Sequence, residues 1–184
     1  MQEHALAALA APPTLAVVRA IEPGQLGNPT PCTEFDVRAL VEHMLHWGPA
    51  LARASRHSDG EAPADGDLLE RLERQIGQLV EAWSVPAAWE GTTSMGGPQE
   101  LPAGMIGAMA VGEIVVHGWD LARATGQEIS WDPGLQDFLY DEVAKTAELG
   151  REMQAYGREV PVPPTAPTLD RMLGLTGRDP AWRP

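Results

Sequence analysis

Cysteine, lysine and long apolar runs are scarce in this chain of 184 residues, and each shortage excludes a class of structure or partner. Cys32 is the single cysteine, so the chain forms no intrachain disulfide and no zinc site built from several cysteines. Lys145 is the only lysine, and 26 acidic residues against 13 basic ones give a formal charge of −13. Nucleic acids and anionic membranes bind through phosphates that attract Lys and Arg, so neither is an expected partner.

Segments that would direct the chain into or across a membrane are also lacking. No stretch approaches the roughly 20 consecutive apolar residues that cross a bilayer. Residues 1–6 have neither the basic start nor the long apolar centre of a signal peptide. We therefore expect a single domain, residues 1–184, that is soluble and cytoplasmic and acts on a small-molecule substrate.

Apolar residues recur with a helical period along most of the chain, which predicts an all-α fold. Thr33 is the expected N-cap of the second helix, with Asp36 as its capping-box acid. Residues 86–102 lack this period and are expected to form a loop or a short hairpin. The predicted helices are residues 2–11, interrupted or kinked at Pro12-Pro13 and resumed over 14–21; a second to about Arg56, kinked or divided at Gly48-Pro49; a third from Asp65 or Asp67; a fourth from about Pro102 to Thr125; a fifth from Asp132-Pro133 to Gly150 or Tyr156; and a last one from Thr168 to Gly177.

Such a set of helices predicts a four-helix bundle with short additional helices at the C-terminus, of a size that often forms homodimers. Within the fourth helix, Glu113 and His117 lie four residues apart and therefore on one face, one turn from each other. The three residues between them are apolar, and a charge in apolar surroundings is costly without a partner. A divalent metal ion would be such a partner, although many pairs of this spacing are simply solvated.

The second helix offers His43 and His46 as further ligands. We favour His43, because Leu40 and Trp47 flank it on one face; His46 is a possible fourth or outer ligand. His43 could also be an ordinary core histidine.

Asp120 lies on the same stripe as Glu113 and His117 and can hydrogen-bond the free nitrogen of a ligating histidine, although it could instead pair with Arg123 or cap a neighbouring segment. Trp119 and Arg123 are close enough along the helix to line the same region.

Two segments carry a resemblance to a known family. Residues 29–43 (PTPCTEFDVRALVEH) and 113–126 (EIVVHGWDLARATG) resemble motifs of the DinB-like metal-binding proteins, in the branch related to the N-terminal domain of mycothiol-dependent maleylpyruvate isomerase. Residues 173–182 (LGLTGRDPAW) are similar to the ending of small members of that branch. The resemblance implies a four-helix bundle with a divalent metal, often zinc or nickel, held by His43, Glu113 and His117. Because the chain lacks the second domain that helps form the isomerase's active site, we do not expect isomerase activity.

The family includes transferases that use mycothiol or bacillithiol, and the leading hypothesis is a metal-dependent thiol transferase. A thiol co-substrate, for which mycothiol is a candidate, would bind the open metal position, lose its proton and attack a small electrophile. Trp47, Trp119, Met44 and Arg123 are the expected cofactor-binding residues. Zinc is the first expectation for the metal, with nickel, iron and cobalt as alternatives.

Two other functions compete with this hypothesis. A hydrolase would use metal-bound water, with Asp120 or His46 as the catalytic acid or base. A non-catalytic metal- or ligand-binding protein would fill every metal position, with His46 as a fourth ligand.

Overall fold

The computed structural model describes residues 2–184, and helices account for most of them. Three short 3-10 helices and a two-stranded antiparallel sheet, in which Thr92 lies opposite Pro102, complete the described elements. The all-α prediction is confirmed. The elements are α1 (Leu6–Arg19), α2 (Val37–Ala54), α3 (Leu68–Ala82), α4 (Ala103–Ala124), α5 (Pro133–Glu152) and α6 (Thr168–Leu175), with η1 (Glu3–Ala5), η2 (Pro23–Gln25), η3 (Pro86–Trp89), β1 (Thr92–Thr93) and β2 (Leu101–Pro102).

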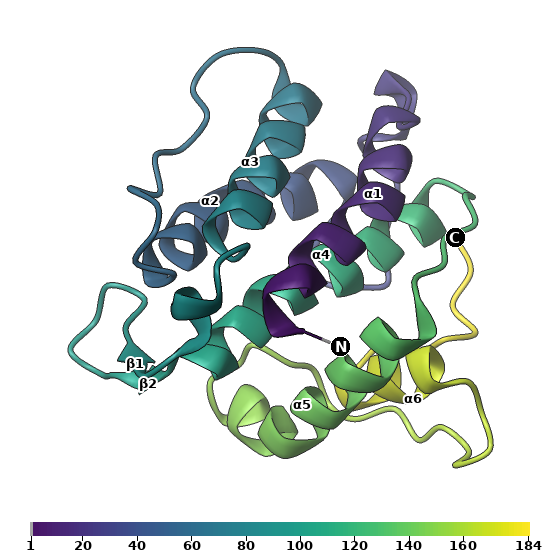
Figure 1. Cartoon of the computed structure of the whole chain (residues 1–184). Helices are drawn as coiled ribbons and strands as arrows, with labels where there is room; N and C mark the ends of the chain where they lie inside the picture. The colour runs from purple at the N-terminus through teal and green to yellow at the C-terminus, as the bar shows by residue number, and fades with distance from the viewer. Residues whose placement is uncertain (1) are drawn as a thin grey trace.

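The first four α-helices form the predicted bundle. Helix α1 packs against α3 and α4, and α2 packs against the same two helices, so each of the four has two neighbours within the bundle. Helix α5 packs on α6 and touches α4 and α1, and Figure 1 shows this pair on one side of the bundle. The core between the helices is apolar, and its largest fully buried side chains are Trp83, Leu6, Leu40, Leu72, Ile76, Ile106, Ile114, Leu121, Leu135, Leu139, Met172 and Leu173.

Helices α1 and α4 approach each other closely at Gly118. A Cβ atom at this position would lie 2.4 Å from Oγ1 of Thr14. The Thr14 hydroxyl donates a hydrogen bond to the carbonyl of Ile114 at 3.0 Å, so it satisfies its own polar group while buried. This contact fixes α4 against α1 at the residue that follows His117.

Of the two outcomes expected at Pro12-Pro13, a break or a kink, the break does not occur, because α1 is continuous from Leu6 to Arg19. Each proline lacks an N–H, so the carbonyls of Ala8 and Leu9 lose their helical partners. Ala8 and Leu9 lie on the exposed side of the helix, where water can take the place of those hydrogen bonds. The buried face of α1 continues on both sides of the prolines and keeps the helix in place.

Helix α2 departs from the prediction at its N-cap, and of the two outcomes expected at Gly48-Pro49 the division does not occur. Its N-cap is Asp36 and not Thr33: the Asp36 carboxylate accepts a hydrogen bond from the Ala39 amide, and the helix begins at Val37. Pro49 lies inside α2 and does not divide it. Gly48 leaves no space for a side chain, because a Cβ there would lie 2.6 Å from Gln75 on α3.

The other helix limits follow their local signals closely. Asp67 caps α3 in a capping box with Glu70, and Asp132 caps α5 with Pro133 in the first helical position. Residues 86–102 contain η3 and the short hairpin of β1 and β2, so the hairpin alternative holds for part of this segment.

By length and composition alone, helix α4 is long and apolar enough to span a membrane. In the fold, however, 78% of its most apolar window is buried inside the protein. Its apolar character therefore fits a core helix of the bundle.

Candidate metal centre

Three side chains from two helices converge at one place in the bundle. His43 comes from α2, and Glu113 and His117 come from successive turns of α4. Each offers one ligand atom, and the three atoms lie within 4.8 Å of one another. Oε2 of Glu113 lies 3.3 Å from Nε2 of His117 and 3.9 Å from Nε2 of His43. The structure thus brings together the three residues that the spacing and the family resemblance had singled out as ligands.

The spacing and the donor types fit a divalent metal ion. Zinc binds imidazole nitrogen and carboxylate oxygen at about 2.0–2.2 Å, which places neighbouring donors roughly 3.3 Å apart in a tetrahedral site. Oε2 of Glu113 is a buried atom without a hydrogen-bond partner, although it faces both imidazoles. A buried acceptor of this kind is costly, and a cation between it and the two imidazoles would satisfy it. His43 and Glu113 keep side-chain exposures of 26% and 30%, so the cluster is open to solvent on their side.

Behind His117 lies a buried carboxylate. Nδ1 of His117 is 3.0 Å from Oδ2 of Asp120, and Asp120 is fully buried. An N–H at Nδ1 that donates to this carboxylate leaves Nε2 free to offer its lone pair to a metal. Asp120 therefore lies where it can orient the His117 ring, and its ion pair is with Arg178 and not with Arg123.

The charges around the cluster shift its pKa values in different directions. Burial opposes a charge on His117, but the charge of Glu113 and the hydrogen bond with Asp120 outweigh it and raise the pKa of His117 to about 9. Burial also opposes ionisation of Glu113, and the positive charge of His117 reverses the effect, so its pKa is lowered. For His43 burial dominates and lowers the pKa, which keeps this imidazole neutral and able to act as a ligand at neutral pH.

His46 and Trp47 lie on α2 near His43 but outside the three-residue cluster. Both side chains are exposed, and their rings meet edge to face with centroids 5.2 Å apart. Trp47 is 41% exposed, an unusual position for so large an apolar side chain, and it is available for contact with a ligand.

The other expected cofactor-binding residues are buried or engaged elsewhere. Met44 and Trp119 are each only 6% exposed and belong to the core. Arg123 lies over the Trp119 ring at 5.8 Å and donates a hydrogen bond to the carbonyl of Trp182 at 2.7 Å. The contacts of Arg123 therefore hold the C-terminal segment against α4.

Four residues near the centre were not assigned a role from the sequence. Arg178 is buried against Asp120, and Phe35 packs on the His43 ring with centroids 5.0 Å apart. Burial raises the pKa of the Cys32 thiol, which works against a nucleophilic role. Burial and then the charge of Glu113 raise the pKa of Tyr156, whose phenol therefore lies near the centre. Arg178 lies within residues 173–182, whose likeness to the family could have drawn attention to it, whereas no local pattern marks Tyr156.

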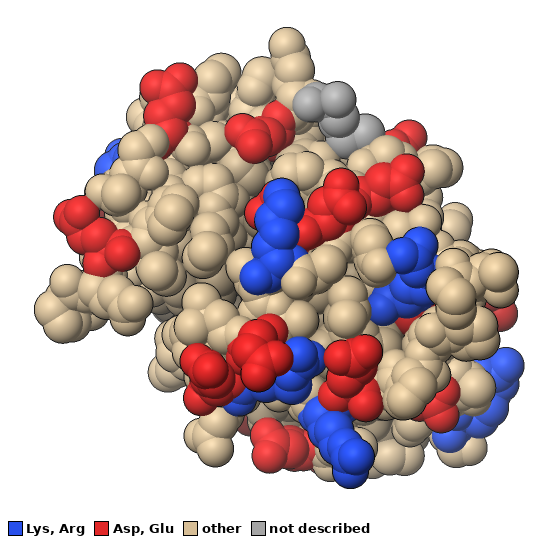
Figure 2. Space-filling view, turned by 90° about the horizontal axis from the view of Figure 1, so that it is seen from below, with Lys and Arg blue, Asp and Glu red and all other residues tan. Residues whose placement is uncertain are grey.

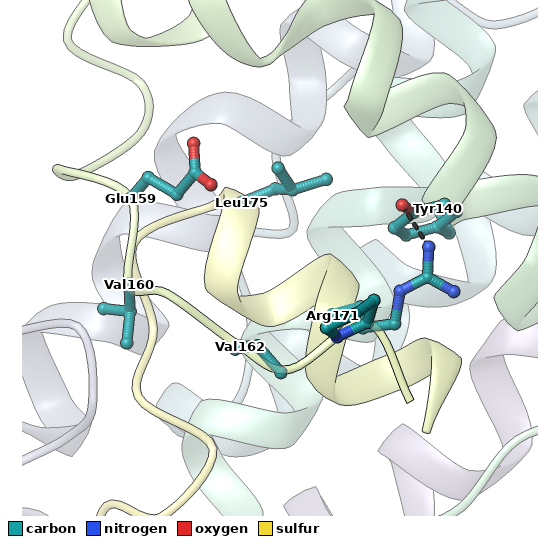
Figure 3. A pocket seen from close by; sticks show the side chains of 7 residues that line it. Tyr140, Glu159, Val160, Val162, Arg171 and Leu175 are labelled. Carbon is teal, nitrogen blue, oxygen red and sulfur yellow. Dashed lines mark hydrogen bonds between the residues drawn. The ribbon is translucent and has the colours of Figure 1, made fainter. Parts of the chain in front are cut away.

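A separate pocket of about 170 Å³ lies between α5, α6 and the segment that joins them. His43, Glu113 and His117 are not among the residues that line it. Figure 3 shows Tyr140 and Arg171 beside each other, with Glu159 at a distance across the pocket. Arg171 donates to the Tyr140 hydroxyl and covers its ring, with 4.1 Å from the guanidinium carbon to the ring centroid. Arg171 is therefore already engaged by Tyr140, and the carboxylate of Glu159 lies 3.8 Å from Nη1 of Arg151.

The surface charges also bear on binding partners. On the face seen from below in Figure 2, Lys and Arg side chains lie next to Asp and Glu, with no continuous basic area. A low affinity for nucleic acid remains our expectation on this ground and from the net charge of −13.

The fold and the cluster define the class: a helical bundle with a possible metal site built from two histidines and a glutamate. A family model described as the mycothiol maleylpyruvate isomerase N-terminal domain matches residues 7–122, and the chain belongs to this family. The chain is similar to two proteins of Mycobacterium tuberculosis, described as uncharacterized protein MT0763 (strain CDC 1551 / Oshkosh) and uncharacterized protein Rv0738 (strain ATCC 25618 / H37Rv). Each is 31% identical over 170 residues, which cover 89% of this chain and 89% of the relative. No solved structure matches the chain.

Proposed function

We propose that this protein is a divalent-metal-dependent enzyme that transfers a low-molecular-weight thiol, mycothiol or a similar thiol, to a small electrophilic substrate. The observation that carries the proposal is the convergence of His43, Glu113 and His117 on one point that is open to solvent. Three protein ligands with an open position are the pattern of catalytic zinc sites, whereas structural zinc sites have four. The family's description names mycothiol, which supports a thiol as the co-substrate.

A divalent ion held there would lower the pKa of a thiol at its open position from the ordinary value of about 8.5, and so favour the nucleophilic thiolate. The residues of the chain supply the binding and the orientation. Neutral His43 and the carboxylate of Glu113 line the solvent side of the centre, and His117 closes its buried side. Asp120 is fully buried and reaches the centre through His117, so we assign it an orienting role and no proton transfer with substrate.

In this proposal Trp47 is the exposed residue near the centre that the substrate contacts. It lies one turn after His43 on α2, and its exposed ring offers a flat apolar surface for the carbon skeleton of an electrophile or of the thiol. We place the reaction in the cytoplasm, where small thiols are kept reduced. Zinc is the ion to test first, because two histidines and a glutamate form a known catalytic zinc ligand set.

The test uses protein purified without a histidine tag and loaded with zinc. Mycothiol and monochlorobimane are added, and conjugation is followed by fluorescence beside metal-free protein and a Glu113→Gln variant. The control is Glu128→Gln, which removes an exposed carboxylate outside the centre. We expect a thiol-dependent rate in the wild type and the control, and no bound zinc and no rate with Glu113→Gln. Equal rates with and without metal would refute the proposal, and ester hydrolysis without thiol would favour a hydrolase.

A further inference from the structure

Arg178 is a buried cation next to the candidate centre. It is only 6% exposed, and its Nη2 lies 3.1 Å from Oδ2 of Asp120, with Nε 3.5 Å from Oδ1. Its Nη1 donates to the carbonyl of Thr176 at 3.1 Å. The guanidinium thus approaches both oxygens of a carboxylate that has no access to water, the geometry in which arginine restricts the plane of a carboxylate.

The same carboxylate oxygen faces His117. Oδ2 of Asp120 lies 3.0 Å from Nδ1 of His117, and Nε2 on the opposite side of the ring lies 3.3 Å from Oε2 of Glu113. Rotation of the Asp120 carboxylate would break its contact with Nδ1 and release the ring. Because the Arg178 guanidinium contacts both oxygens of this carboxylate, the carboxylate cannot rotate freely. The His117 imidazole therefore keeps Nε2 turned toward the other two ligand atoms.

The backbone after α6 places the Arg178 side chain next to Asp120. The helix ends at Leu175, Gly177 two residues later has a φ of +87°, and the Arg178 amide then donates to the Leu173 carbonyl at 2.9 Å. A Cβ on Gly177 would lie 2.7 Å from the Cα of Gly157, so both the backbone conformation and the space require glycine here.

From this geometry we infer that Arg178 is a positioning residue of the metal centre, which acts through Asp120 to hold His117 with Nδ1 as donor and Nε2 as ligand. The inference deepens the proposed function and rests on its metal site. It also extends the site beyond residues 7–122, the part that the family model matches, to a segment after α6.

A purely structural role, in which Arg178 only docks the C-terminal segment, is the alternative that an experiment must exclude. The readout is therefore zinc affinity, measured by competition with a chromophoric chelator, together with the visible absorption spectrum of the cobalt-loaded protein. The variant is Arg178→Gln. The matched control is Arg183→Gln, which removes an exposed arginine of the same segment that donates hydrogen bonds to the carbonyls of Ala181 and Trp182.

We expect Arg178→Gln to lower zinc affinity about tenfold, as loss of an outer partner of a ligating histidine does, and to shift the cobalt bands. Arg183→Gln should keep the wild-type affinity and spectrum. In an Asp120→Asn background, Arg178→Gln should cause no further loss, because its effect passes through that carboxylate. A merely structural role predicts lower thermal stability with an unchanged spectrum and unchanged affinity.

If Arg178→Gln does not fold, as judged by circular dichroism, Arg178→Lys decides the question. An ammonium group cannot span both carboxylate oxygens, so we still expect about a tenfold loss of zinc affinity. Wild-type affinity in the Arg178 variants overturns the inference and leaves the proposed function intact. Zinc binding without thiol transfer removes the proposed function and leaves the inference standing.

Discussion

Loss of the proton from His117 should make the metal-free protein less stable as the pH rises above neutrality. The pKa of this imidazole is raised from 6.5 to about 9 in the folded protein by Glu113 and Asp120, against the opposing effect of burial. A raised pKa means that the folded state binds the proton more tightly than the unfolded state does. The stabilisation is therefore complete below pH 6.5 and is lost as the pH rises through 9.

The size of the effect follows from the two pKa values. Each tenfold difference in proton affinity corresponds to about 1.4 kcal/mol, so the change from 6.5 to about 9 corresponds to about 3 kcal/mol. The other two groups of the cluster act in other pH ranges: the lowered pKa of His43 acts below 6.5, and the lowered pKa of Glu113 acts below 4.5. Most of the change between pH 6.5 and 9 should therefore come from His117.

The assay is urea unfolding of EDTA-treated protein at several values between pH 6.5 and 9, with the free energy of unfolding extrapolated to water. We expect the wild type to lose about 3 kcal/mol across this range and His117→Gln to lose little. His57→Gln, which removes an exposed imidazole after α2, serves as the control and should keep the wild-type loss. A flat wild-type profile, or the same slope in His117→Gln, would refute the assignment of this proton to His117.

Three further outcomes follow from the structure. Gly118→Ala should destabilise the fold by about 1–3 kcal/mol in thermal or urea unfolding, because its Cβ would overlap Thr14. Gly112→Ala on the same helix has nothing within 4 Å of its Cβ and should be neutral or slightly stabilising. Equal effects of the two substitutions would contradict the packing at Gly118. Asp120→Asn should lower zinc affinity by about 10- to 100-fold in chelator competition, and wild-type affinity would argue against its orienting role. Trp47→Ala should raise the KM for the electrophile with little change in unfolding free energy, because the ring is 41% exposed; unchanged steady-state kinetics would remove Trp47 from the substrate pocket.

Local signals predicted most of the helices and the two halves of the centre. The spacing of Glu113 and His117 places both on one side of a helix whatever the helix packs against, because it depends only on the helical repeat. Caps such as Asp67 and Asp132 act on backbone amides two or three residues away, so they too can be read without the fold. At the start of α2, Thr33 and Asp36 are both residue types that cap helices, and the structure shows Asp36 as the N-cap expected of Thr33.

Packing between distant segments decided the rest. The prolines of α1 stay within a helix because its buried face continues past them, a tertiary contribution that outweighs local propensity. His43 meets the other two ligand atoms only because α2 packs against α4, and Arg178 meets Asp120 only because the chain turns back after α6. The sequence by itself determined the helices and the face on which each candidate ligand lies, since those depend on hydrogen bonds and periods within a few residues. Only the tertiary structure decided which faces meet, because that depends on how side chains far apart in the chain fill a common core.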